Sequence, residues 1–254
     1  MELYEAVNLL SDFCCVRDLP SLSQSALIKR FGFGQADVMV LFGGSILAGG
    51  DVLASAMREN MAKTYIIAGG AGHTTPVLRD KMRILLPGAD TERMQEAELF
   101  QMYLQHVHQL QADHLETRST NCGNNITNLL ALLMQNNIPC KSMILTQDGS
   151  MQRRMGATLR KYAPHMQCIH YAAYQAHFNG EMQYDAPIKG MWDRERFITL
   201  LLGEIARLRD DEQGYGPRGK DFIAHEDIPP QVEEAFRLVQ SRYAVRDANP
   251  LFAG

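Results

Sequence analysis

The stretch Ala36-Asp-Val-Met-Val-Leu-Phe-Gly-Gly-Ser45 decides the fold. Its first part is an apolar run of strand length, which is typical of a strand buried on both faces, and it ends in a glycine-rich turn. A helix is predicted at residues 51–62, a second strand at 64–68 and a second glycine-rich turn at 69–73. Strands that alternate with helices pair in parallel through right-handed crossovers. We therefore predict an α/β fold with a mainly parallel sheet.

The same kinds of pattern predict strands and helices on both sides of this region. Further strands are predicted at 114–115, 141–146 and 167–172, and further helices at 3–13, 21–31, 91–106, 126–134, 151–160, 197–208 and 232–243. The composition changes after about residue 180, and residues 209–220 form a charged, glycine-rich loop. We predict an α/β domain at 1–185, with N-terminal helices and a core at about 36–171, and a mostly helical C-terminal subdomain at 186–254.

Composition narrows the class of protein. The chain has 254 residues, of which 46% are hydrophobic, so it can bury a sizeable core. The net charge is −4 and the charges are interspersed, which predicts no nucleic-acid partner. No apolar run reaches the ~18 residues that span a bilayer, and the N-terminus lacks a basic leader region. The five cysteines have no metal-binding spacing, so we predict reduced thiols and a cytoplasmic location; the sequence indicates no oligomeric state.

Polar or glycine-rich segments follow four of the predicted strands. They are residues 43–45, 69–73, 116–125 and 147–154. In open parallel sheets, ligands bind outside the carboxyl ends of the strands, where the strand order reverses. Glycines let backbone N–H groups approach a ligand, and the side chains orient it. We therefore predict a small-molecule cleft, with tight strand-to-helix geometry as the alternative explanation of the glycines. Neither glycine turn has the GxGxxG spacing of a dinucleotide site, and no P-loop is present.

The stretch Glu116-Thr-Arg-Ser-Thr-Asn-Cys-Gly-Asn-Asn125 precedes an apolar helical pattern. Ser119, Thr120 or Asn121 can cap this helix, and a helix start suits an anionic or polar ligand. Asn121 and Asn125 are four residues apart and share a face. The alternative is a well-capped helix with a solvated loop.

Several side chains in these segments are candidates for chemistry. His73 is the best general acid or base among the histidines, although a hydrogen-bonded loop histidine is equally compatible with its position. Glu96 is a candidate base or ribose-hydroxyl acceptor, with an ordinary surface acid as the alternative. The catalytic candidates are His73, Glu96, Glu116 and Asp148. The predicted ligand-binding residues are Gly43, Gly44, Ser45, Gly69, Gly70, Gly72, Arg118, Ser119, Asn121, Asn125, Gln147, Ser150 and Arg153. Adjacent residues on a helix point in different directions, so only one of Arg153 and Arg154 is expected to face the cleft. No metal site is predicted.

Several motifs together resemble the SanA/ElyC/YdcF family, a bacterial domain of unknown function. They are Val40-Leu-Phe-Gly-Gly-Ser45, Ala68-Gly-Gly70, Glu96-Ala97, the stretch 116–125 and Leu145-Thr-Gln-Asp-Gly-Ser-Met-Gln-Arg153. The resemblance covers about residues 36–171 and is greatest to the YdcF branch, with Gly214-Tyr-Gly-Pro-Arg-Gly-Lys220 extending it. It implies a Rossmann-like α/β/α sandwich. For the YdcF branch it also implies binding of S-adenosylmethionine, with no established reaction.

The chain departs from the family pattern at four positions. Cys122 stands where the family has Thr and Asn124 where it has Glu, while Gly149 and Ser150 replace Tyr and His. If that histidine is an acid or base in the family, this chain lacks it. The departure favours a binding role or altered chemistry.

Three functions are compatible with the sequence. The first is a soluble S-adenosylmethionine-binding protein. The second is a transferase or hydrolase acting on a phosphorylated, nucleotide-like or envelope-precursor substrate, whose anion would be held by Arg118, Asn121, Asn125 and Arg153. The third is a non-catalytic ligand sensor or interaction module that uses the loop 209–220 as a lid or partner surface.

Overall fold

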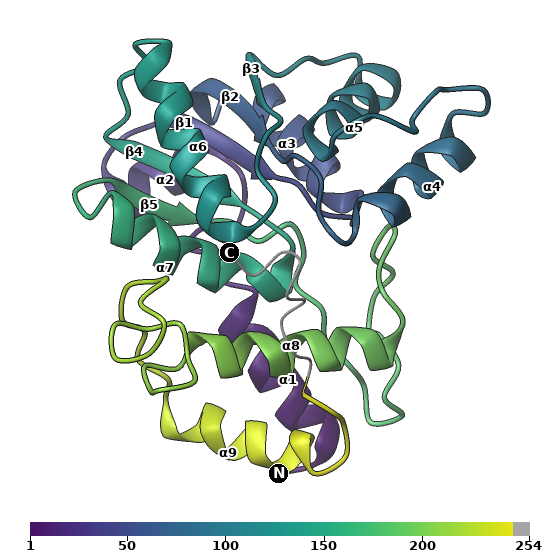
Figure 1. The fold of residues 1–254 in the computed structure, drawn as a ribbon, viewed down its shortest axis with the longest axis vertical. Coiled ribbons are helices and arrows are strands. Elements are labelled where there is room, and N and C mark those ends of the chain that lie inside the picture. The colour runs from purple at the N-terminus through teal and green to yellow at the C-terminus, as the bar shows by residue number, and fades with distance from the viewer. Residues whose placement is uncertain (246–254) are drawn as a thin grey trace.

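A five-stranded, all-parallel sheet forms the centre of the computed structural model, which describes residues 1–245 (Figure 1). The strands are β1 (Ala36–Phe42), β2 (Ala62–Ala68), β3 (His114–Glu116), β4 (Ser142–Thr146) and β5 (Gln167–His170). Their order across the sheet is β3-β2-β1-β4-β5. The predicted α/β fold is thereby confirmed.

The central strand β1 shows why the sheet is covered on both faces. Its side chains alternate, so Met39 and Leu41 pack into one hydrophobic cluster and Val38 and Val40 into another. The first cluster includes residues of α2 (Gln24–Phe31), α3 (Ala48–Arg58), α4 (Thr75–Leu85) and α5 (Glu96–Tyr103). The second includes residues of α6 (Cys122–Gln135) and α7 (Gln152–Tyr162), which follows a short 3₁₀ turn at Gly149–Met151. These layers make the Rossmann-like sandwich.

The strand order places the switch point between β1 and β4. From β1 the chain crosses to β2 and β3 on one side, and it later returns to β4 and β5 on the other. The loops that leave β1 and β4 therefore diverge at the carboxyl edge of the sheet. Such a divergence opens a crevice in which ligands of this fold class bind.

The region between β2 and β3 differs from the sequence prediction. The expected helix at 91–106 is shorter: α5 spans Glu96–Tyr103 and continues as a π-helical turn, Leu104–His108. A helix that was not predicted, α4, begins at Thr75 with Pro76 in its first turn. Proline suits that position because its missing N–H would have no helical partner there.

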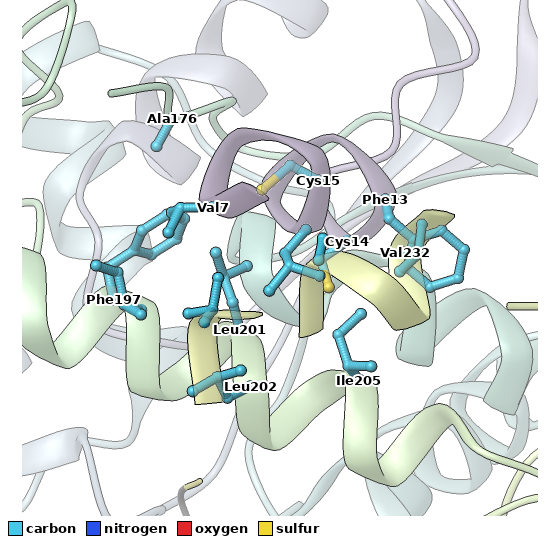
Figure 2. Packing of buried hydrophobic residues seen from close by; sticks show 14 of the residues in the cluster. Val7, Phe13, Cys14, Cys15, Ala176, Phe197, Leu201, Leu202, Ile205 and Val232 are labelled. Carbon is cyan, nitrogen blue, oxygen red and sulfur yellow. The ribbon is translucent and has the colours of Figure 1, made fainter. Parts of the chain in front are cut away.

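A third hydrophobic layer lies beside the sandwich and joins the two ends of the chain. It contains α1 (Leu3–Cys14), α8 (Arg194–Leu208) and α9 (Pro230–Gln240). Figure 1 shows α8 between α7 and α9, and Figure 2 shows α1 residues such as Val7 packed near Leu201 of α8. The first helix, which the sequence assigned to the α/β domain, thus packs with the C-terminal helices. Residues 246–254 of the predicted C-terminal subdomain lie outside the described residues.

Helix length and composition also bear on the membrane prediction. Across residues 1–245, no helix combines the length and the apolar composition needed to cross a bilayer.

Candidate functional site

A cavity of about 440 Å³ lies at the carboxyl edge of the sheet and receives side chains from all four polar segments. The predicted site residues that line it are Gly43, Gly44, Ser45, Gly69, Gly70, Gly72, His73, Glu96, Ser119, Asn121, Asn125, Gln147, Asp148 and Ser150. The volume is within the ordinary range for small-molecule sites. The structure therefore brings most of the predicted residues to one cavity.

The glycines of the two turns have different roles. A Cβ atom on Gly43 would lie 2.4 Å from Glu96 Oε2, and one on Gly69 would lie 2.9 Å from the Cα of Gly43. Close packing therefore requires glycine at both positions. A Cβ on Gly44 would meet only Gln147 Oε1, at 3.6 Å, and one on Gly72 would meet nothing closer than 3.7 Å. The bare backbone at Gly44 and Gly72 is thus not explained by packing against protein atoms.

Glu96 is a buried acid and not the surface acid that its sequence position also allowed. It is 7% exposed, although it begins α5 and lines the cavity. Thr75 Oγ1 donates a hydrogen bond of 2.8 Å to its carboxylate and itself accepts one of 2.7 Å from the Gly72 N–H. Burial raises the pKa of Glu96 to about 7, against the opposing effect of the Thr75 and Thr74 hydroxyl groups. Near neutral pH this side chain can accept or donate a proton.

The start of α6 forms a second wall. Asn121 caps the helix by accepting from the Asn124 N–H at 3.0 Å, and the Asn124 carboxamide oxygen accepts from the Asn121 N–H at 2.9 Å. Within the described residues, the buried Oδ1 of Asn125 and the buried Oγ of Ser45 have no hydrogen-bond partner. Both residues line the cavity. An unsatisfied buried polar atom is costly, so a hydrogen-bonding partner would be favourable at these two atoms.

Asp148 organises the turn after β4. One carboxylate oxygen accepts from the N–H and Oγ of Ser150, at 3.1 and 2.8 Å, and from the Tyr174 hydroxyl at 2.5 Å. Burial raises the pKa of Asp148, while the hydrogen bonds from Tyr174 and Ser150 lower it. The Ser150 hydroxyl therefore donates to Asp148.

Three predicted residues do not line the cavity. Arg153, on the first turn of α7, was the wrong choice of the adjacent pair: its Nε donates to the Phe13 carbonyl of α1 and its Nη1 to Glu226, at 3.2 Å. Glu116 is buried outside the cavity. Its Oε1 accepts hydrogen bonds from the Arg118 N–H and the Asn128 side chain. The Arg118 side chain is exposed. Arg154 lines the cavity in place of Arg153.

The C-terminal region supplies lining residues that the sequence reading missed. Arg154 makes a bidentate ion pair with Glu204 of α8, at 2.5 and 2.9 Å, and Arg207 Nη1 lies 3.2 Å from the same carboxylate. Burial by itself lowers the pKa of Arg154, but Cys122 and Glu204 raise it, so the guanidinium stays charged. Trp192, Tyr215 and Phe222 also line the cavity. The sequence held a signal for this wall, because Glu204 is an acid that follows the apolar run Leu200-Leu-Leu202 of α8.

His73 lies exposed on the cavity wall. Among residues 1–245, no group of three histidine, cysteine, aspartate or glutamate side chains is arranged to hold a metal ion. A comparison with models of protein families found none that matches this chain.

Proposed function

We propose that this protein binds S-adenosylmethionine in the cavity between the β1 and β4 strand ends. The observation that carries the proposal is the position of Glu96: a buried carboxylate beside Gly43 and Gly72, in a cavity of suitable size. The resemblance to the YdcF branch supports the identity of the ligand.

The lining chemistry fits a nucleoside bearing an amino-acid chain. The Glu96 carboxylate can accept hydrogen bonds from the two ribose hydroxyl groups, as an acid near the glycine turn does in related nucleotide folds. Gly44 and Gly72 leave room for a ring or sugar to contact the backbone. Asn125 Oδ1 and Ser45 Oγ can pair with the adenine amino group or the ligand's ammonium group.

The two acids at the strand ends favour this ligand over a phosphorylated one. Two carboxyl groups, Glu96 and Asp148, line the strand-end part of the cavity. In their ionised forms they attract the sulfonium and ammonium groups of S-adenosylmethionine and repel a phosphate dianion. Arg153, one of the four residues expected to hold an anion, donates to the Phe13 carbonyl of α1 and does not line the cavity. Arg154 does line it, and its guanidinium is paired with Glu204.

Calorimetric titration of the purified protein with S-adenosylmethionine tests the proposal. We expect saturable binding that weakens at least 10-fold in Glu96→Gln. The matched control is Glu98→Gln, two positions along the same helix: Glu98 does not line the cavity, and glutamine retains its hydrogen bond to the Gln95 N–H. Absence of heat at millimolar ligand with the wild-type protein would refute the proposal. Equal affinities of the two variants would remove Glu96 from the binding site.

A further inference from the structure

The cavity extends beyond the strand ends into a second part, which we call the α7–α8 lobe. Its walls come from α7, α8 and the loop that follows α8 (Figure 1). Its apolar lining residues are Tyr162, Leu200, Tyr215, Phe222 and Ile223. None of them belongs to the four strand-end segments on which the proposed function depends. The lobe therefore offers a ligand different chemistry from that of the strand ends.

The charged side chains of the lobe bind one another. Arg154 makes its bidentate ion pair with Glu204, and Arg207 Nη1 lies 3.2 Å from the same carboxylate. All three side chains are largely buried. Breaking a buried ion pair is strongly unfavourable, because it leaves a charge without its partner. A charged ligand would compete with pairs that the protein already makes, so the lobe favours an uncharged ligand.

The loop after α8 holds the Phe222 ring at the wall of the lobe. The Phe222 N–H donates to the Tyr215 carbonyl at 2.8 Å, and the two rings pack edge to face with centroids 5.2 Å apart. The preceding residue, Asp221, has a φ of +52°, and its carbonyl accepts a hydrogen bond from Lys161 of α7. Residues other than glycine rarely adopt this backbone conformation unless the surrounding contacts hold them in it. The loop and α7 together therefore fix the position of Phe222.

Two aromatic rings in this lobe keep much of their surface uncovered by the protein. Phe222 is 40% exposed and Tyr162 is 45% exposed, although both line the cavity. They enter from opposite walls, and the Lys161–Asp221 contact brings their sequence neighbours together. An apolar ligand would remove this surface from water, and an aromatic ligand would add ring stacking to that gain. The lobe therefore favours a flat aromatic molecule.

We propose that the α7–α8 lobe binds a second small ligand, an uncharged molecule with a flat aromatic ring. Its ring contacts Phe222 and Tyr162, and Leu200 and Ile223 cover more of its apolar surface. The paired charges of Arg154 and Glu204 stay paired when it binds. The inference uses the same cavity as the proposed function, but it does not depend on the identity of the ligand at the strand ends.

Ligand-observed NMR titration of the full chain tests this with β-naphthol, its saturated analogue decahydro-β-naphthol and its anionic analogue β-naphthoate. The saturated alcohol is also apolar but cannot stack, so we expect β-naphthol to bind at least 3-fold more tightly than it. We expect at least a 10-fold preference over β-naphthoate. Both preferences should hold without S-adenosylmethionine and at saturating concentrations of it. Absence of β-naphthol binding, or affinities for either analogue that equal or exceed its own, would overturn the assignment. Displacement of β-naphthol by S-adenosylmethionine would also overturn it, because the lobe would then belong to the strand-end ligand.

Variants locate the site. Phe222→Leu keeps an apolar side chain and removes the ring, so we expect the preference for β-naphthol over its saturated analogue to disappear. Tyr162→Leu should reduce the same preference. The control is Phe31→Leu, the same change in a partly buried ring of α2 outside the cavity. A preference retained in both lobe variants would overturn the proposal.

Calorimetry with S-adenosylmethionine separates this inference from the proposed function. We expect Phe222→Leu to bind S-adenosylmethionine with the wild-type affinity. Loss of that affinity would assign the ring to the strand-end ligand and overturn the second site. Failure of the wild-type protein to bind S-adenosylmethionine refutes the proposed function alone, because the β-naphthol titration does not require it.

Discussion

At the scale of single residues, Glu96 is a buried acid on the cavity wall. Its carboxyl group is buried, and burial moves its pKa from 4.5 to about 7. The folded protein therefore holds this proton more tightly than the unfolded chain does. The stabilising contribution of the protonated form is complete below pH 4.5 and is lost as the pH rises through 7. Above that pH the buried carboxylate carries its full desolvation cost.

Glu96→Gln should remove this pH dependence. The shift corresponds to on the order of 3 kcal/mol of unfolding free energy between the two protonation states. We expect the wild type to lose stability relative to the variant as the pH rises from 5 to 8, because glutamine imitates the protonated acid. Urea denaturation at several pH values measures the difference. Parallel curves for the two proteins would show that Glu96 does not titrate in this range.

Gly44→Leu tests whether the open backbone at the cavity wall serves a ligand. A Cβ there meets only Gln147 Oε1, at 3.6 Å, and the rest of the side chain would extend from the cavity wall, so we expect the protein to fold. We expect at least a 10-fold loss of affinity for S-adenosylmethionine, measured by calorimetry. Gly180→Leu is the control, because a Cβ at that loop position meets no atom within 4 Å and the residue lies outside the cavity. A Gly44→Leu protein that binds normally would place the ligand elsewhere.

Residue types and their positions after the strands were enough to predict most of the residues that line the cavity. They were not enough to choose between Arg153 and Arg154. Both residues follow β4, and they differ only in the direction in which their side chains leave α7. The choice depends on Phe13 and Glu226, which approach Arg153 from distant parts of the chain. Local sequence carries no information about such contacts.

At the scale of elements, α4 connects two parts of the cavity wall. One is the turn after β1, and the other is the segment that leads from the sheet to α8. Lys81 of α4 donates to the carbonyl groups of Ser45 and Gly190, both at 2.6 Å, and lies 5.2 Å from the Trp192 ring. Burial lowers the pKa of Lys81. This lysine therefore fixes one cavity wall to another. Sequence reading missed α4 because Pro76 and the polar residues before it are typical of a loop as well as of a helix start.

Lys81→Met should loosen this connection without unfolding the sheet. Two carbonyl groups lose their charged donor, so we expect faster amide exchange in residues 188–192 and weaker binding of S-adenosylmethionine. Hydrogen–deuterium exchange by mass spectrometry measures the first effect. Lys29→Met, an exposed lysine of α2, is the control. Unchanged exchange in residues 188–192 would contradict the linking role.

At the scale of the whole molecule, the two ends of the chain are packed together. Leu10 of α1 is fully buried in the cluster that also contains Phe197 and Val239. The alternation of strands and helices predicted the sandwich because that pattern is local. The packing of α1 against α8 and α9 was not predictable, because an amphipathic helix does not specify which distant apolar face covers it.

Leu10→Ala should destabilise the molecule as one unit. Truncation of a fully buried leucine costs about 2–5 kcal/mol. We expect the fluorescence of the single tryptophan, Trp192, and the far-ultraviolet circular dichroism to shift to lower urea together. Two separated transitions would show instead that the helical layer unfolds as an independent domain.

The proposed function requires a small molecule that lies across the β1 and β4 strand ends. A crystal soaked with S-adenosylmethionine tests this most directly. We expect ligand density between residues 43–45 and 147–150, with the ribose hydroxyl groups in hydrogen-bonding distance of Glu96. Ligand density at another surface, or an unchanged cavity after a saturating soak, would contradict it.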